Sequence, residues 1–128
     1  MNYLLDAHTL VWALDSPDKL SKNAVLVLEN LESNLLISAG TMWELSIKFS
    51  MKKLSLSMPF RIWMEKGFTD LGLTLMPINL AHSDKQVGLD FHHKDPFDRI
   101  LAAQALTEGI SIISIDSIFD QYGVTRIW

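Results

Sequence analysis

Short apolar segments alternate with longer segments of helical periodicity along the chain, and this alternation limits the folds that the chain can adopt. Five segments have the character of strands, at residues 2–6, 34–38, 73–78, 110–114 and 123–128. Strands that are apolar on both faces are typical of parallel sheets covered by helices on both sides. The pattern therefore predicts an α/β protein, a three-layer α/β/α sandwich with a central, mainly parallel sheet of about five strands.

Helix signals fill the intervals between these strands. Ser21 and Asn79 are suitable N-caps, and Gly109 is suited to end a helix. Apolar residues recur at helical spacing in the same intervals. The expected helices lie at residues 8–15, within 16–33, at 39–54 and 57–71, within 79–91 and at 96–108.

The length of 128 residues predicts a single domain, residues 1–128. The chain has no cysteine, which excludes a disulfide scaffold and thiolate metal sites and fits a reducing compartment. The longest uncharged stretch has 13 residues, from 71 to 83, which is too short for a membrane span. No basic segment precedes the short apolar run at the N-terminus, so a signal peptide is not expected, and we predict a cytoplasmic protein.

The net charge of −4 argues against a protein that binds nucleic acid by bulk attraction. Carboxylates gathered in one pocket contribute to such a count, however, and bound divalent cations reverse the local sign. Some basic residues are also grouped, as at Lys48, Lys52 and Lys53 and again at Lys94 and Arg99.

The segment "HHKDPFDRILAAQA", residues 92–105, places two aspartates at the start of an expected helix. Asp95 is a favourable N-cap and Pro96 a favourable first helical residue. Asp98 then lies in the first turn, where the helix dipole favours a carboxylate. Local physics therefore requires neither aspartate to be catalytic.

Four acids, two of them at strand ends, are nevertheless expected at one edge of the sheet. Asp6 follows the first strand and Asp116 the fourth, while Glu44 and Asp98 lie early in helices. Right-handed crossovers bring the carboxyl ends of parallel strands to the same edge, where sites form in sheets of this kind. Four such carboxylates repel one another unless a cation lies between them, and oxygen ligands suit Mg²⁺ or Mn²⁺.

Each of these acids also has a purely structural interpretation. Asp6 could cap the helix that follows it, and Glu44 could pair with Lys48 four residues later. Asp98 could be only a first-turn acid, and Asp116 could begin a turn. The apolar neighbours of Glu44 in the sequence, Trp43 and Leu45, favour a buried position for it.

Several segments resemble PIN-domain ribonucleases, specifically VapC-type toxins of toxin–antitoxin pairs. The resemblance runs almost from end to end of the chain and is most specific at the fourth segment quoted below. One departure is Ser50, near a position where relatives often have glycine before "KL", and another is "LDF" before the double histidine. The segments are "LLDAHTLVWAL", "LSKNAVLVLEN", "ISAGTMWELSIKFSMKKL", "HHKDPFDRILAAQALTEGISIISID" and "YGVTRIW".

This resemblance implies a PIN-like fold and a metal-dependent endoribonuclease. It places Asp6, Glu44, Asp98 and Asp116 on the metal-binding acids, and Asp95 on the aspartate that starts the helix. Mg²⁺ or Mn²⁺ held there would position and activate a water for attack on an RNA phosphodiester. The implied partners are an RNA substrate, a VapB-type antitoxin and a second copy of the chain, with no membrane.

Four other residues are candidates for substrate contact. Arg99 is expected either to contact phosphate at the rim or to pair with another acid. Ser114 is expected to steady a metal-bound water or to be a satisfied hydroxyl at a strand end. Lys48 is the possible partner of Glu44. His93 belongs to a histidine pair that is better suited to contact RNA or solvent than to bind zinc.

The roles of the tryptophans and of one helix remain open in the sequence, and two other functions are alternatives to the ribonuclease. The four tryptophans could stack on bases or serve a core or an interface. The helix at 58–71 is apolar on more than one face, which suggests that one face packs on the sheet and the other on a dimer or antitoxin partner.

A receiver-type signalling domain would need an aspartate after the third strand, where this chain has "PINLAH". A PIN fold acting mainly as a binding partner is the other alternative.

Overall fold

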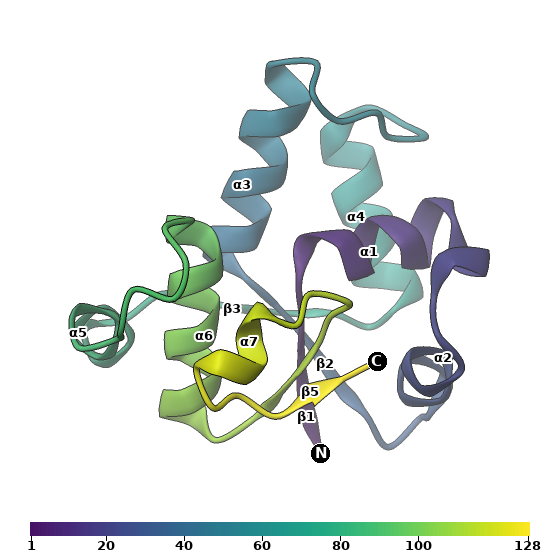
Figure 1. Ribbon diagram of the computed structural model, residues 1–128. Coiled ribbons are helices and arrows are strands. Elements are labelled where there is room, and N and C mark those ends of the chain that lie inside the picture. Colours follow the sequence, from purple (N-terminus) through teal and green to yellow (C-terminus); the bar gives the residue numbers. More distant parts are fainter.

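A computed structural model describes residues 1–128, and its centre is a five-stranded sheet (Figure 1). All strand pairs are parallel, in the order β3-β2-β1-β4-β5. The predicted α/β class and mainly parallel sheet are therefore confirmed. The strands are β1 (Asn2–Leu5), β2 (Asn34–Ser38), β3 (Thr74–Met76), β4 (Ser111–Ile113) and β5 (Arg126–Ile127).

Seven α-helices and one short 3₁₀ helix, Pro17–Lys19, connect the strands. Ser21 and Asn79 cap helices as predicted, and Gly109 ends one in the left-handed conformation. The helices are α1 (Ala7–Asp15), α2 (Lys22–Glu29), α3 (Ala39–Ser50), α4 (Phe60–Asp70), α5 (Leu80–Val87), α6 (Pro96–Glu108) and α7 (Ile118–Gln121).

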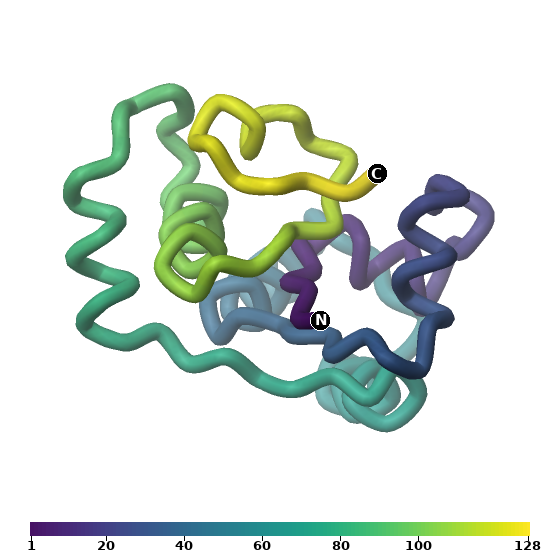
Figure 2. Tube along the Cα trace, turned by 90° about the horizontal axis from the view of Figure 1, so that it is seen from below, coloured from purple at the N-terminus to yellow at the C-terminus, as the bar shows by residue number.

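The strands alternate their side chains between two cores, because successive residues of a strand point to opposite faces. Leu5, Ile37 and Ile113 belong to the core under α1 to α4, whereas Leu4 and Ile112 belong to the core under α6 and α7. Seen from below, the central strands run between α6 and α7 on one side and α1, α2 and α4 on the other (Figure 2). None of the helices combines the length and the apolar character that crossing a membrane requires.

Helix α3 ends earlier than its apolar pattern predicts, at Ser50 instead of residue 54. Ser50 itself remains helical, and the backbone turns left-handed at Lys52, with φ of 58°. Lys52 directly precedes Lys53 and Leu54, and it is the only non-glycine residue with positive φ. The helix therefore cannot continue to Leu54.

Replacing Lys52 with glycine should raise the free energy of unfolding by about 0.5–1 kcal/mol. A left-handed backbone costs an L residue about 1–2 kcal/mol, and glycine avoids this cost. Glycine also gives the unfolded chain more conformational entropy, which offsets part of the gain in stability. Urea denaturation measures the change. Lys52→Ala, which removes the amine but keeps Cβ, should leave the stability within about 0.5 kcal/mol of wild type; an equal gain in both variants would contradict the backbone explanation.

Helix α4 does not have the second apolar face that the sequence suggested. Trp63, Met64 and Gly67 are buried against the rest of the domain. The outward side carries the ion pair of Arg61 and Glu65, at 3.0 Å. Ile62 is the one large apolar side chain of α4 that is exposed, so this face is mainly polar.

Candidate functional site

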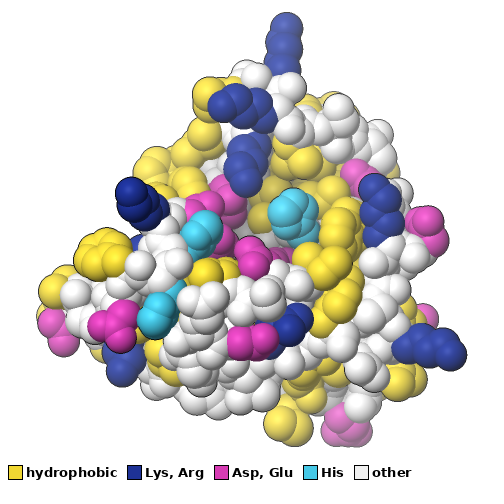
Figure 3. Space-filling view, in the orientation of Figure 1, with side chains coloured by type: hydrophobic (Ala, Val, Ile, Leu, Met, Phe, Trp, Pro, Cys, Tyr) yellow, Lys and Arg dark blue, Asp and Glu magenta, His cyan; other side chains and the backbone are white.

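The strand order places a crevice at the carboxyl ends of β1 and β4. The chain moves from β1 toward β2 and β3 on one side and returns to β4 and β5 on the other, so β1 and β4 flank the switch point. A pocket of about 70 Å³ opens there. Figure 3 shows Asp and Glu side chains gathered in a hollow on this face, with lysine or arginine above them and histidine on both sides. The acids that line the pocket are Asp6, Glu44, Asp95, Asp98 and Asp116.

Asp6 has both of the positions that the sequence left open, as helix cap and as pocket acid. Its Oδ1 accepts a hydrogen bond from the Thr9 backbone N–H at 2.9 Å, which caps α1. Its Oδ2 accepts from the hydroxyl of Ser114. Thr9 in turn donates from Oγ1 to the carbonyl of Ile113 at 2.7 Å. The start of α1 is therefore fixed to β4, and the carboxylate, 6% exposed, has a defined orientation.

Ser114 connects two of the pocket acids. It is fully buried, and its Oγ accepts from the Asp116 backbone N–H at 3.0 Å while donating to Asp6. The alternative of a satisfied hydroxyl at the strand end is therefore what the structure shows, and the hydroxyl positions both acids. Asp116 is exposed and also accepts from the Ile118 N–H at 3.0 Å, so it begins the turn into α7.

The loop that carries Asp116 is held by Arg126, which the sequence did not single out. Its Nη1 donates to the carbonyl of Ser114 at 3.1 Å. Its Nε and Nη2 donate to the two carboxylate oxygens of Asp120, both at 3.0 Å. This hydrogen bonding lowers the pKa of Asp120 and raises the pKa of Arg126. An arginine in a short terminal strand carries no sequence signal for this function.

Glu44 lies in the pocket and also forms the ion pair that its spacing from Lys48 allows. The Lys48 Nζ donates to Glu44 Oε2 at 2.8 Å. The Glu44 side chain is nearly buried, whereas that of Lys48 is 45% exposed. The hydrogen bond to Glu44 raises the pKa of Lys48, with further contributions from Asp95 and Asp98. Lys48 therefore lies at the mouth of the pocket as a permanent cation.

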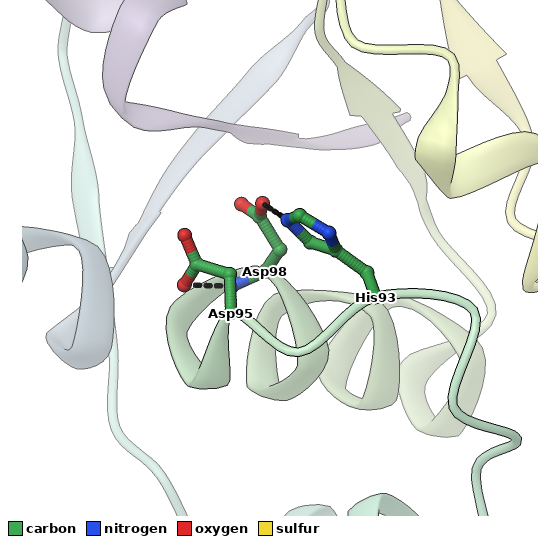
Figure 4. A group of neighbouring side chains, drawn as sticks. All are labelled: His93, Asp95 and Asp98. Atoms are coloured by element: carbon green, nitrogen blue, oxygen red, sulfur yellow. Dashed lines mark hydrogen bonds and ion pairs between the residues drawn. The ribbon is translucent and has the colours of Figure 1, made fainter.

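Asp95, Asp98 and His93 form the tightest group of the site (Figure 4). Asp95 is the N-cap of α6, and its Oδ1 accepts from the N–H groups of Phe97 at 2.8 Å and Asp98 at 3.4 Å. His93 Nε2 lies 3.0 Å from Asp98 Oδ2. One ligand atom from each of these three residues lies within 4.8 Å of the others. Asp95 therefore both shapes the helix start and adds negative charge to the pocket.

The pKa of the Asp98 carboxyl is raised to about 6. Burial is the main cause, followed by the negative charges of Asp95 and Glu44, and Asp116 adds to them. His93 acts in the opposite direction. Each carboxylate disfavours the ionisation of the next, so a positive charge in the pocket would stabilise their ionised forms.

Arg99 does not form the pair with an acid that was one of its two expected contacts. It is 3% exposed and forms no ion pair, and the ring of Phe91 covers its guanidinium at 4.0 Å. Its side chain is turned away from the acids because it fastens the segment before His93. The acceptors of its guanidinium are the carbonyls of Gln86, Leu89 and Asp90, at 3.1, 3.2 and 2.8 Å, and the Tyr122 hydroxyl, at 3.3 Å.

Four residues of the pocket wall were not predicted from the sequence: Ala7, His8, Phe97 and Leu101. His8 stacks on Trp12 with 5.6 Å between ring centroids. The only available signal was position, since each residue lies next to or near a pocket acid along a helix. Trp43 is exposed rather than part of an apolar neighbourhood around Glu44, whereas Leu45 is buried.

The family model for the PIN domain matches residues 3–124. Solved structures with the same fold include VapBC2 from Rickettsia felis bound to a DNA fragment from their promoter, with 15% identity, a TM-score of 0.76 and coverage of 98% of this chain and 97% of that chain.

DNA-bound VapBC from Salmonella typhimurium gives 15% identity, a TM-score of 0.69 and coverage of 98% and 96%. A toxin–antitoxin complex from Klebsiella pneumoniae gives 19% identity, a TM-score of 0.58 and coverage of 90% and 87%. At these identities the likeness shows a common fold. No curated protein matches the chain in sequence.

Proposed function

The chain belongs to the PIN domain family, whose members are generally nucleases, and from this premise we propose that it is a Mg²⁺- or Mn²⁺-dependent endoribonuclease. We further propose that it is a VapC-type toxin, with a VapB-type antitoxin as partner. The observation that carries the proposal is the convergence of acids from four separate segments on one pocket at the switch point of the sheet.

The donor set fits a hard divalent cation. All four proposed ligands, Asp6, Glu44, Asp98 and Asp116, offer carboxylate oxygens, which Mg²⁺ and Mn²⁺ prefer. The pKa of Asp98 is raised mainly by burial and further by the neighbouring carboxylates, and a bound cation would offset both effects. When bound, such an ion would polarise a water and offset the charge that develops on the phosphate.

The chain's own residues would orient this site and the substrate. Ser114 holds the Asp6 carboxylate and the Asp116 backbone in fixed positions, and His93 holds Asp98. Lys48 Nζ is the exposed cation of the pocket and would contact a phosphate oxygen of the RNA at its mouth. No side-chain nucleophile is required, because the attacking group would be water.

The toxin assignment rests on different support. The resemblance of the segments around the acids points to VapC-type toxins, and solved structures of the same fold are VapBC and toxin–antitoxin complexes. An antitoxin segment with a basic residue would complement the acidic pocket electrostatically. We propose on the same grounds that the chain forms a homodimer.

Purified protein incubated with total cellular RNA provides the test. With Mg²⁺ we expect discrete fragments, and with EDTA or with the Asp6→Asn variant we expect none, because both remove a component of the cation site. Asp70→Asn, which removes an exposed acid of α4 outside the pocket, is the matched control and should cut like wild type. Cleavage that persists in EDTA, or intact RNA after incubation of metal-loaded wild type, would contradict the proposal.

A further inference from the structure

Trp43 differs from the other tryptophans in being largely uncovered. Trp63 is fully buried, and Trp12 and Trp128 are half-buried against each other, whereas Trp43 is 64% exposed. It is the only large apolar side chain of α3 that is exposed. Its ring surface is therefore available for contact with a ligand.

Trp43 lies at the rim of the acidic pocket. Its ring packs edge to face on Phe97, with 5.8 Å between centroids and 73° between planes. Phe97 lines the pocket. Trp43 directly precedes Glu44 and Phe97 directly precedes Asp98, and adjacent residues of a helix point about 100° apart. The two acids therefore point inward while the aromatic pair flanks them.

We propose that Trp43, held by Phe97, is a stacking platform for an unpaired base of single-stranded RNA next to the phosphate that would be cut. This inference rests on the proposed ribonuclease function and adds a base-contacting residue to its site. An edge-to-face pair fixes the ring orientation but leaves ring surface free, and stacking of a base on an aromatic side chain contributes about 1–3 kcal/mol. A base held in a duplex has no free face for such a contact.

One cation of the pocket lies on the same helix as the platform. Lys48 lines the pocket, pairs with Glu44 at 2.8 Å and keeps 45% of its side chain exposed, so its ammonium can also meet a phosphate. Aromatic rings beside basic side chains are the usual composition of grooves for single-stranded nucleic acid. A protein interface of standard size buries about 800 Å² on each partner. Trp43 is the single exposed large apolar residue of α3, so this helix offers little apolar surface for such an interface.

The test compares binding of two labelled strands by fluorescence anisotropy, with Ca²⁺ in place of Mg²⁺. One is an oligoadenylate of about twelve nucleotides, within the length that such grooves cover; the other has the same backbone with every base removed. Trp43→Ala should weaken binding of oligoadenylate about 5- to 150-fold, and Trp43→Phe should retain most of the affinity. The strand without bases offers no ring, so it should bind wild type and Trp43→Ala alike.

Ile62→Ala is the matched control, since it removes an exposed apolar side chain from α4, outside the pocket, and should not change either affinity. The proposal would be overturned if Trp43→Ala lost affinity equally for both strands or bound oligoadenylate as wild type does. It would also be overturned if wild type did not bind oligoadenylate. Unchanged RNA binding together with a loss of dimer mass in sedimentation would assign Trp43 to a protein interface instead. Cleavage of total RNA is measured separately, so failure of the platform and failure of the nuclease are distinguishable.

Discussion

The Asp98→Asn variant should lose RNA cleavage by about 10²- to 10³-fold and yet unfold less easily than wild type in EDTA near neutral pH. Both effects have one cause, the negative charge that Asp98 carries at a largely buried position beside other acids. Removing it weakens the proposed cation site, and single groups that stabilise developing charge are worth about this factor in rate. Removing it also removes the cost of burying a charge and the repulsion from neighbouring carboxylates in the metal-free fold.

The pH dependence follows from the raised pKa of Asp98. The folded chain binds this proton up to about pH 6, whereas the ordinary value is 3.8, so the charged carboxylate destabilises the fold at higher pH. Its cost grows as pH rises from about 4 to about 6 and reaches at most about 3 kcal/mol, at about 1.4 kcal/mol per pKa unit. The stability advantage of the Asp98→Asn variant over wild type should therefore be present near neutral pH and absent below about pH 4.

Thermal unfolding in EDTA across this pH range measures the effect. Asp120→Asn is an instructive control, because Arg126 lowers the pKa of Asp120 and the sign is reversed. That variant should lose stability at neutral pH, and the loss should disappear as pH falls. A wild type more stable than Asp98→Asn at neutral pH in EDTA would contradict the cost assigned to the charged Asp98 carboxylate. Mg²⁺ should stabilise wild type more than Asp98→Asn, because ligands stabilise the state that binds them.

Arg99→Ala should lower the free energy of unfolding by about 3–5 kcal/mol. The buried guanidinium donates to three backbone carbonyls and to the Tyr122 hydroxyl, and the truncation leaves these acceptors without a partner. Each buried polar group that loses its partner costs about 1–3 kcal/mol. Arg99→Lys should recover only part of the loss, since an ammonium cannot reach four acceptors in the same plane.

Urea denaturation of Arg99→Ala beside Arg61→Ala provides the comparison. Arg61 pairs with Glu65 on the exposed side of α4, where such pairs contribute about 0–1 kcal/mol. Similar small losses in the two variants would show that the carbonyls near His93 find other donors. Arg99→Lys should also cut RNA less efficiently than wild type, because the segment that presents His93 to Asp98 is less firmly held.

Much of the fold was readable in the sequence because its signals are local. Apolar strands, the caps at Ser21 and Asn79 and the stop at Gly109 each act within a few residues. The end of α3 was misjudged because apolar periodicity continues to Leu54, while the backbone conformation at Lys52 decides where the helix stops. Helix α7 is a single turn, too short for a periodic signal.

Placement of the acids was predictable because parallel strands bring their ends to one edge. The contacts around them were less so, because they depend on side-chain direction. Arg99 follows Asp98 in the sequence, but the helix turns it toward carbonyls on the other side of α6. Ser114 donates to Asp6, 108 residues away, and Arg126 donates to the carbonyl of Ser114, 12 residues away. Nothing in the sequence indicates these partners.

The assembly of the pocket from four distant segments has a consequence for a chain that is still being synthesised. Asp6 emerges first, but its carboxylate is oriented by Ser114, which is synthesised late and directly follows β4, the neighbour of β1 in the sheet. Asp98 and Asp116 also come from the last third of the chain. A nascent chain thus carries the first acids without the strand that aligns them. Nuclease activity, on the proposed function, would begin only when β4 has docked beside β1, which keeps the RNA around a translating ribosome out of reach of a half-made enzyme.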